Sequence, residues 1–254
     1  MDLAEQAVVV TGAGSGMGKA TACRLARRNA LVAALDIAAK PVLALTQELG
    51  GLGIECDVGS ESSVRTAIQR VVAELGPPRV LVNCAGIAAA QRISGRKGPH
   101  DLGLFQKVIR TNLVGTFNMM RLVAEEMKQL DPVGESGARG VMINTASVAA
   151  YEGQIGQAAY SASKGGVVAL TLPAARELAQ FGIRVVTVAP GLIGTPMLHA
   201  MPEEVQASLA SQVPFPRRLG SADEFAALVE HIIDNEMLNG EVIRLDGAIR
   251  LQSE

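Results

Sequence analysis

A tyrosine and a lysine one helical turn apart are the residues of this sequence best suited to acid-base chemistry. The stretch QAAYSASKGG, residues 157 to 166, places Tyr160 four positions before Lys164. On a helix these side chains would lie on one face, with the phenol close to the ammonium. Using a tyrosine phenolate near neutral pH takes roughly 4 kcal/mol of stabilisation, part of which a neighbouring cation can supply. Spacing alone is equally compatible with a solvated surface pair, and the other tyrosine, Tyr151, has Ile155 at the same offset.

The surrounding elements are predicted from short apolar runs that alternate with helix-like segments. Runs that are apolar on both faces indicate parallel strands covered on two sides. We therefore expect a single-domain, Rossmann-like α/β fold over residues 1–254, with a doubly wound sheet of about seven parallel strands flanked by helices. The predicted strands are 7–11, 31–36, 53–56, 80–84, 141–145, 184–189 and 241–245, and the predicted helices are 18–29, 41–49, 61–75, 102–130, 157–181 and 222–235.

Composition and charge argue against several classes of protein. The net charge of −2 offers nucleic acid no broad attraction, because such affinity rests on clustered Lys and Arg. Three cysteines without CxxC spacing and three scattered histidines indicate neither a disulfide framework nor a metal site. No apolar run reaches the roughly 20 residues of a membrane span, and the sequence opens on an apolar strand without a basic leader. We expect a cytoplasmic protein with no membrane partner.

A glycine-rich motif follows the first predicted strand. TGAGSGMG, residues 11 to 18, opens the first predicted helix, where a helix N-terminus and a close backbone approach suit a pyrophosphate. Taken alone, the motif is also compatible with a flexible turn. The residues that we expect to bind a dinucleotide here are Gly12, Ser15, Gly16, Met17 and Gly18.

An acidic residue ends the second predicted strand. Asp36 lies 18 residues after Gly18, near the spacing expected of a carboxylate that binds the adenosine ribose. Its charge would repel a 2′-phosphate, and neither Ile37 nor Ala38 offers that phosphate a cationic partner. The sequence therefore predicts NAD rather than NADP as the cofactor. Asp36 also suits the N-cap of the next helix, and the two roles are compatible.

Together these residues resemble the short-chain dehydrogenase/reductase family over essentially the whole chain. Beyond Thr11 to Gly18 and Asp36, the matching positions are Asp57 and Val58 at an adenine-contacting pair, Asn83, Ala85 and Gly86 in an Asn-Asn-Ala-Gly motif, and Asn112, Ser147, Tyr160 and Lys164 at the catalytic residues. Cys84 departs from the second Asn of that motif.

The resemblance implies a role for each of these residues. Tyr160 would act as general acid and base, and Ser147 would hold the substrate oxygen. Lys164 would also hold the nicotinamide ribose, and Asn112 would anchor a relay water. The segment Pro190, Gly191, Ile193 and Thr195 would seat the nicotinamide. Each residue also has a plain structural reading: a strand-end turn for Ser147, a helix cap or kink for Asn112, and an ordinary turn for Thr195.

Within the family, stretches such as VMINTASVAAYEGQIGQAAYSASKGG and APGLIGTPML resemble the type 10 17β-hydroxysteroid dehydrogenases, a subfamily also called type II 3-hydroxyacyl-CoA dehydrogenases. This resemblance implies reversible, NAD-dependent oxidation of (S)-3-hydroxyacyl-CoA in a homotetramer, with hydroxysteroids or other secondary alcohols as further substrates. Alternatives are a 3-oxoacyl-[acyl-carrier-protein] reductase, which usually prefers NADP, and a non-enzymatic scaffold or RNA-associated subunit.

Substrate-binding residues are expected in two loops and beside the Tyr160 helix. An insertion-like segment after the fourth strand carries Arg92, Arg96 and Lys97, which suit the phosphates of coenzyme A but are also compatible with a solvated basic loop. Gln154 and Gln157 flank the start of the Tyr160 helix and would meet the acyl oxygen or thioester. A C-terminal substrate loop is expected over about 190–215.

Overall fold

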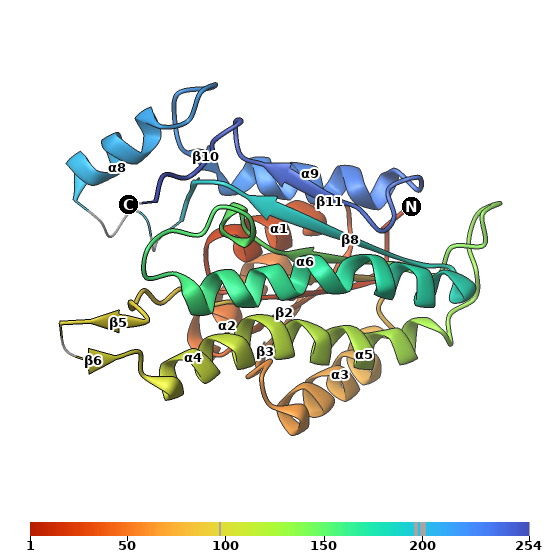
Figure 1. Ribbon diagram of the computed structural model, residues 1–254. Coiled ribbons are helices and arrows are strands. Elements are labelled where there is room, and N and C mark those ends of the chain that lie inside the picture. Colours follow the sequence, from red (N-terminus) through yellow and green to blue (C-terminus); the bar gives the residue numbers. More distant parts are fainter. Residues whose placement is uncertain (97, 196–197, 199–201, 254) are drawn as a thin grey trace.

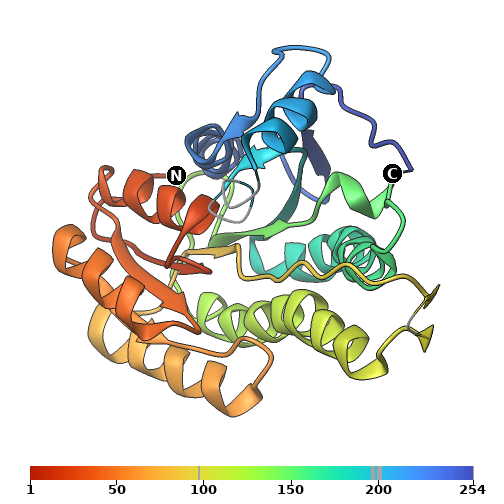
Figure 2. The same cartoon turned by 90° about the vertical axis from the view of Figure 1, so that its left-hand side faces the viewer.

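The computed structural model describes residues 1–96, 98–195, 198 and 202–253. Its centre is a parallel sheet of seven strands in the order β11-β8-β7-β4-β1-β2-β3, lying between two layers of helices (Figures 1 and 2). The strands are β1 (Ala7–Thr11), β2 (Leu31–Asp36), β3 (Leu52–Glu55), β4 (Val80–Asn83), β7 (Gly140–Thr145), β8 (Ile183–Pro190) and β11 (Val242–Leu245). The predicted fold is confirmed, and each strand end lies within one residue of its predicted position.

The two faces of the sheet bury alternate residues of each strand. Val8 and Val10 of β1 pack against α1 (Gly16–Ala26), α2 (Ala39–Leu49) and α9 (Ala222–Asp234). Val9 points to the opposite face, which is covered by α3 (Glu61–Leu75), α5 (Gly115–Met127) and α6 (Ala158–Leu178). Because both faces are covered, the strands read as continuous apolar runs, and this made them predictable from sequence.

The chain changes direction across the sheet between β1 and β4. β1 pairs with β2 on one side and with β4 on the other, and the helices that follow cover opposite faces of the sheet, α1 after β1 and α5 after β4. Open α/β sheets bind their ligands in the crevice that forms outside the carboxyl ends of strands at such a point.

Several shorter elements were not predicted. The segment 85–99 contains a hairpin, β5 (Ser94–Gly95) with β6 (Gly98–Pro99), and β9 (Ile193–Gly194) pairs with β10 (Gly220–Ser221). The segment over about 190–215, predicted as a C-terminal substrate loop, contains α8 (Glu203–Ser211). The predicted helix over 102–130 is instead α4 (Leu102–Ile109), a π-helical segment η1 (Arg110–Val114) and α5. Strands of two residues carry no local periodicity, and a π-turn is rare enough that no local pattern marks it.

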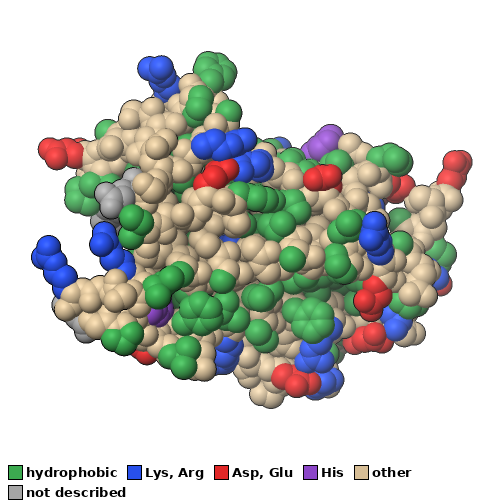
Figure 3. All heavy atoms as spheres, in the orientation of Figure 1, with side chains coloured by type: hydrophobic (Ala, Val, Ile, Leu, Met, Phe, Trp, Pro, Cys, Tyr) green, Lys and Arg blue, Asp and Glu red, His purple; other side chains and the backbone are tan. Residues whose placement is uncertain are grey.

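The hairpin, α8 and the C-terminal tail lie at one end of the molecule, at the left in Figure 1. In Figure 3 the surface at that end is hollowed between the hairpin side and the α8 side. Among the described residues, no helix combines the length and the apolar character that crossing a bilayer requires.

Candidate active site

The loops after β1 and β4 meet backbone to backbone. The Thr11 hydroxyl accepts hydrogen bonds from the N–H groups of Cys84 (3.2 Å) and Ala85 (3.1 Å). Gly12 has a φ of +65°, and a Cβ there would lie only 2.8 Å from the Ala85 nitrogen. Only glycine fits this approach, because the contact would be with backbone atoms that cannot move aside.

The loop from Gly12 into α1 forms a cradle beside Asp36. Gly14 N–H donates to Asp36 Oδ2 (3.0 Å), and Ala38 N–H donates to Oδ1 (3.0 Å). The α2 N-cap is Ala38, so Asp36 does not cap that helix directly. Ser15 is the N-cap of α1 but its side chain makes no capping hydrogen bond, and the first turn of α1 holds no acidic residue. This helix N-terminus therefore favours an anion.

Asn112 is fully buried in η1, where its side chain joins three parts of the chain. Its Oδ1 accepts from Ile87 N–H (2.8 Å), and its Nδ2 donates to the Ile87 carbonyl (2.9 Å) and to Ser163 Oγ (3.0 Å). The Ser163 hydroxyl in turn donates to the Tyr160 carbonyl (2.7 Å). Asn112 thus fixes the loop after β4 to the Tyr160 turn of α6.

Ser147 and Tyr160 are brought together across the carboxyl edge of the sheet. Ser147 caps the short helix η2 (Val148–Ala150), and its Oγ accepts from Ala149 N–H (3.1 Å). Burial raises the pKa of the Tyr160 phenol above its ordinary value of 10, and a hydrogen bond with Ser147 acts in the opposite direction. The sequence pointed to a lowered pKa; in the protein alone, burial outweighs the hydrogen bond with Ser147 and the pKa is raised. Tyr160 therefore carries its proton at neutral pH.

Lys164 lies one turn after Tyr160, as predicted, with its Nζ 5.9 Å from the tyrosine ring centroid. The Nζ is buried and donates to the backbone carbonyl of Thr145 at the end of β7 (2.6 Å). Burial lowers the pKa of Lys164 to about 8. Burial also raises the pKa of the neighbouring Cys84 thiol to about 11, so this departure from the Asn-Asn-Ala-Gly motif adds no negative charge at neutral pH.

Comparison with known proteins agrees with this geometry. A model of the short chain dehydrogenase family matches residues 6–206. The chain belongs to the short-chain dehydrogenase family. It is 55% identical over 248 residues to the 3-hydroxyacyl-CoA dehydrogenase type-2 of Homo sapiens, covering 96% of this chain and 95% of that protein. It is 34% identical to the (3R)-3-hydroxyacyl-CoA dehydrogenase of Mus musculus, covering 95% of each. The crystal structure of 3-hydroxyacyl-CoA dehydrogenase type-2 from Mycobacterium avium superposes with a TM-score of 0.93 at 45% identity, covering 98% of this chain and 97% of that one.

This dehydrogenase is therefore an oxidoreductase, and a nicotinamide cofactor fits the cradle described above. A Cβ on Gly14 would lie 2.9 Å from Asp36 Oδ2, and a Cβ on Gly18 would collide with the Gly12 carbonyl. Only glycine at these two positions lets the loop pack this closely, which sets the α1 N-terminus beside Asp36. Among the described residues, no group of three or more His, Cys, Asp or Glu is arranged to hold a metal ion.

Asp57 and Val58, predicted at the adenine end, lie in the loop after β3. Asp57 Oδ1 accepts from Gly59 N–H (2.9 Å), and Oδ2 pairs with Arg110 at the start of η1. The buried Val58 offers its carbonyl to Asn118 Nδ2 (2.9 Å). Both residues are held by side chains from η1 and α5.

The Asn-Ala-Gly positions lie between the two halves of the dehydrogenase site. Buried Asn83 donates to Asn144 Oδ1 (2.9 Å) on the adjacent strand, while its own Oδ1 has no partner. Ala85 is bonded to Thr11, and a Cβ on Gly86 would lie 3.3 Å from Asn112 Oδ1 and 3.6 Å from Lys164 Nζ. Gly86 therefore lies close to the side chains of both Asn112 and Lys164.

The segment predicted to seat the nicotinamide continues from β8. Pro190 ends that strand, and Gly191 N–H donates to the Leu245 carbonyl (2.9 Å). Ile193 is buried in β9, and the Thr195 carbonyl accepts from Leu198 N–H (2.9 Å). The segment starts at the same sheet edge as Ser147.

Gln154 and Gln157 bind each other. Gln157 Oε1 accepts from Gln154 N–H (3.1 Å), and Gln157 Nε2 donates to Gln154 Oε1 (3.3 Å). Gln154 Nε2 donates to the Gln252 carbonyl (3.2 Å) of the C-terminal tail. The two side chains shape the wall before α6, and contact with substrate stays a prediction.

Two of the three basic residues predicted to bind coenzyme A lie at the β5–β6 hairpin, Arg92 shortly before β5 and Arg96 directly after it. Arg92 and Arg96 are exposed, whereas Lys97 lies outside the described residues. Gln91 N–H donates to the Gly156 carbonyl (2.8 Å), which ties the base of the hairpin to the loop before the Tyr160 helix. The hairpin therefore stands beside the catalytic edge.

Sequence reasoning did not assign a function to Thr11 itself, Thr145 or Ser163. Thr11 and Thr145 are the last residues of β1 and β7, and Ser163 lies between Tyr160 and Lys164. Their positions next to predicted site residues were the available signal. Their specific hydrogen bonds depend on loops that are distant in sequence.

We predict that Thr11→Val destabilises the protein by about 2 kcal/mol, because the part-buried Ala85 N–H loses its acceptor and the Cys84 N–H keeps only the Thr11 carbonyl (3.3 Å), without a change of shape. Urea denaturation would measure this. The matched control is Thr46→Val, since the buried Thr46 hydroxyl donates only within its own helix. Equal stability losses in the two variants would contradict the role given to Thr11.

Proposed function

We propose that this dehydrogenase interconverts (S)-3-hydroxyacyl-CoA and 3-oxoacyl-CoA with NAD. The observation that carries the proposal is that Ser147 lies close to Tyr160 at the carboxyl edge of the sheet, with buried Lys164 one turn away. The names of the similar proteins, 3-hydroxyacyl-CoA dehydrogenase type-2, support the substrate class.

The choice of NAD rests on Asp36. Its carboxylate is held by two backbone N–H groups at the end of β2, and the exposed Ile37 and Ala38 that follow offer a 2′-phosphate no cation. The charge of Asp36 would favour the ribose hydroxyls and repel that phosphate. NAD supplies the hydride acceptor and donor of the reaction when bound. The same feature disfavours an NADP-dependent acyl-carrier-protein reductase.

The side chains of this chain account for the proton chemistry. Tyr160, which carries its proton, donates it to the substrate carbonyl oxygen during reduction and removes it from the alcohol during oxidation. Ser147 donates a hydrogen bond to the same oxygen, where negative charge develops. Lys164 places a positive charge beside the phenol and so favours the tyrosinate that remains after proton transfer. Asn112 holds the Tyr160 turn in place.

The acyl-CoA assignment draws on the hollowed end of the molecule. The hairpin with Arg92 and Arg96 lies on one side, and α8 lies on the other (Figures 1 and 3). Guanidinium groups suit the pyrophosphate and 3′-phosphate of coenzyme A. Hydroxysteroids and other secondary alcohols are further candidate substrates, because the proton chemistry requires only a secondary alcohol.

We also propose a homotetramer in the cytoplasm. Apolar side chains are exposed on the face formed by α4 to α6, which is turned toward the viewer in Figures 1 and 3; they include Leu102, Val114, Phe117 and Leu172. Such a face suits pairing between copies, with the C-terminal strand region at a second interface. The three cysteines are free thiols, as is usual in a reducing compartment.

The first test of the proposed function is the oxidation of NADH, followed at 340 nm, with acetoacetyl-CoA as substrate. We expect turnover with NADH to exceed turnover with NADPH, and Tyr160→Phe to reduce kcat by at least about a hundredfold, the contribution typical of a general acid. Tyr151→Phe is the matched control, because Tyr151 is exposed and stacks on Arg244. Absence of turnover with either cofactor would refute the acyl-CoA assignment.

A pH dependence follows from Lys164. With its pKa lowered to about 8, the ammonium is charged at pH 7 and loses its proton as the pH rises. We expect kcat for reduction to fall above about pH 8. Lys164→Arg would keep the charge at high pH, so its lower rate should lack this inflection. A wild-type profile that stays flat to pH 10 would contradict the role of the ammonium.

The hairpin charges give a substrate-specific prediction. Replacing Arg92, Arg96 and Lys97 together by Ala should raise KM for acetoacetyl-CoA while sparing a small alcohol without CoA, because only the former loses phosphate contacts. Replacing Arg65, an exposed arginine on α3, is the control for a general loss of charge. Equal losses on the two substrates would remove the CoA role.

A further inference from the structure

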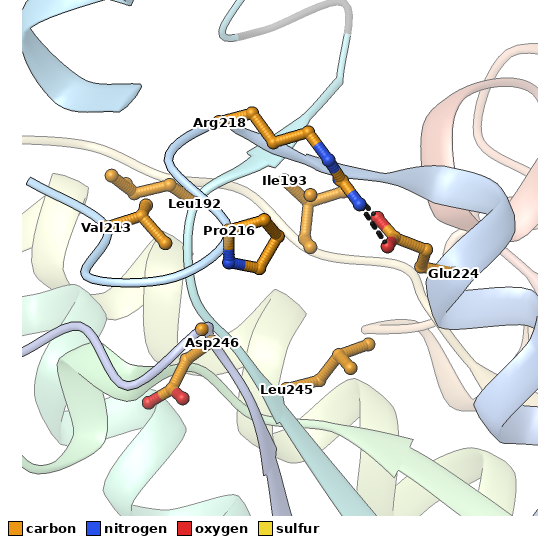
Figure 4. A pocket seen from close by; sticks show the side chains of 10 residues that line it. Leu192, Ile193, Val213, Pro216, Arg218, Glu224, Leu245 and Asp246 are labelled. Carbon is orange, nitrogen blue, oxygen red and sulfur yellow. Dashed lines mark hydrogen bonds and ion pairs between the residues drawn. The ribbon is translucent and has the colours of Figure 1, made fainter. Parts of the chain in front are cut away.

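A cavity of about 110 Å³ lies beside the segment that follows β8. Figure 4 shows its lining, which comes from three stretches of chain: Leu192 and Ile193 after β8, Val213 and Pro216 in the turn before β10, and Leu245 and Asp246 at the end of β11. Protein interiors are otherwise closely packed. On this side, the Leu192–Ile193 stretch therefore lacks part of the side-chain contact that would fix its position.

An ion pair closes the side of this cavity next to α9. Arg218 Nη2 donates to Glu224 Oε1 (2.7 Å) and Arg218 Nη1 donates to Oε2 (2.8 Å), the paired geometry drawn in Figure 4. Two parallel bonds between a guanidinium and a carboxylate fix direction as well as distance. The pair therefore defines where the turn bearing Arg218 stands relative to Glu224.

The start of α9 holds Glu224 in a fixed position. It is the third residue of α9 and forms a reciprocal capping box with Ser221: Ser221 N–H donates to Glu224 Oε2 (2.8 Å), and Glu224 N–H donates to Ser221 Oγ (3.1 Å). The next residue, Phe225, is fully buried in the core between the sheet and its covering helices. The position of Glu224 is thus set by the main core of the protein.

The turn held by this ion pair contacts the segment predicted to seat the nicotinamide. Gly220, two residues after Arg218, donates its N–H to the Leu192 carbonyl (2.9 Å), and β10 pairs with β9. A Cβ on Gly220 would lie 2.5 Å from Ile193 Cδ1, so the two stretches are in close contact. A continuous chain of contacts therefore runs from α9 through Glu224, Arg218 and β10 to β9, and it sets the position of β9.

We propose that Arg218 and Glu224 are positioning residues for the nicotinamide half of the cofactor, acting through β10 on the segment from Pro190 to Thr195. The proposal rests on the proposed function in taking that segment as the nicotinamide seat. Neither side chain is required to touch the cofactor. The ion pair holds β9 in place where the cavity leaves it without packing support.

The test compares the binding of NADH with that of ADP-ribose, which lacks the nicotinamide, without any substrate present. Titrations by NADH fluorescence and by calorimetry would use the wild type, Arg218→Ala and Glu224→Gln. Glutamine also serves at this position of a capping box, so Glu224→Gln removes the ion pair while keeping the helix cap. We expect Kd for NADH to rise about tenfold in both variants, the loss of one charge-assisted contact, and Kd for ADP-ribose to change less than about twofold.

The matched control is Glu74→Gln. It breaks the Arg70–Glu74 pair on α3, whose side chains are 49% and 45% exposed, against 52% and 44% for Arg218 and Glu224. Exposed ion pairs contribute little to global stability, so all three variants should fold, and thermal unfolding would verify this. Unchanged NADH binding, or equal weakening of NADH and ADP-ribose, would overturn the positioning role. Failure of the wild type to bind NADH would instead refute the proposed cofactor, and the inference with it.

Discussion

The contact between the loops after β1 and β4 is the constraint on which the site depends. Backbone meets backbone there only because residue 12 is glycine. The Thr11 hydroxyl accepts from the Ala85 N–H and shares the Cys84 N–H with the Thr11 carbonyl. This contact fixes the distance between the two halves of the crevice. The dinucleotide cradle and Asp36 lie on one side, and Lys164 and Ser147 lie on the other. A shift of either loop would change the distance between Asp36 and Lys164, which the proposed cofactor would have to span.

The buried polar groups near Tyr160 are also held by hydrogen bonds to the backbone and to neighbouring side chains. Lys164 is tied to the carbonyl of Thr145 on β7, and Asn112 is tied to Ile87 and to Ser163 on α6. Burying such groups is unfavourable unless each finds a partner, so the arrangement tolerates few alternatives. The same burial that makes it rigid raises the pKa of Tyr160 and lowers that of Lys164. Burial is thus the common cause of the rigidity of these side chains and of their shifted pKa values.

A structural feature could be predicted from the sequence when the interactions that determine it are between residues close together in the chain. The strands could be predicted because covered parallel strands are continuous apolar runs, and Tyr160 with Lys164 because a helix fixes their spacing. The hairpin at 94–99 could not, since its pairing is set by contacts such as Gln91 with Gly156. The mutual pairing of Gln154 and Gln157, and the direction in which burial moves the Tyr160 pKa, depend on the folded surroundings. Lys97 lies outside the described residues, so its contact with coenzyme A stays a prediction.

The C-terminal tail is part of the wall beside the Tyr160 helix. The carbonyl of Gln252 accepts from Gln154, and that of Ser253 accepts from Ile155 N–H (2.9 Å). Arg244 and Arg250 pair with Glu152 in the same loop. The N-terminus lies at the far end of the molecule (Figure 1). For anyone preparing this enzyme, a purification tag or an immobilisation linker therefore belongs at residue 1 rather than at residue 254, because Gln252 and Ser253 are bonded to the loop that precedes the Tyr160 helix.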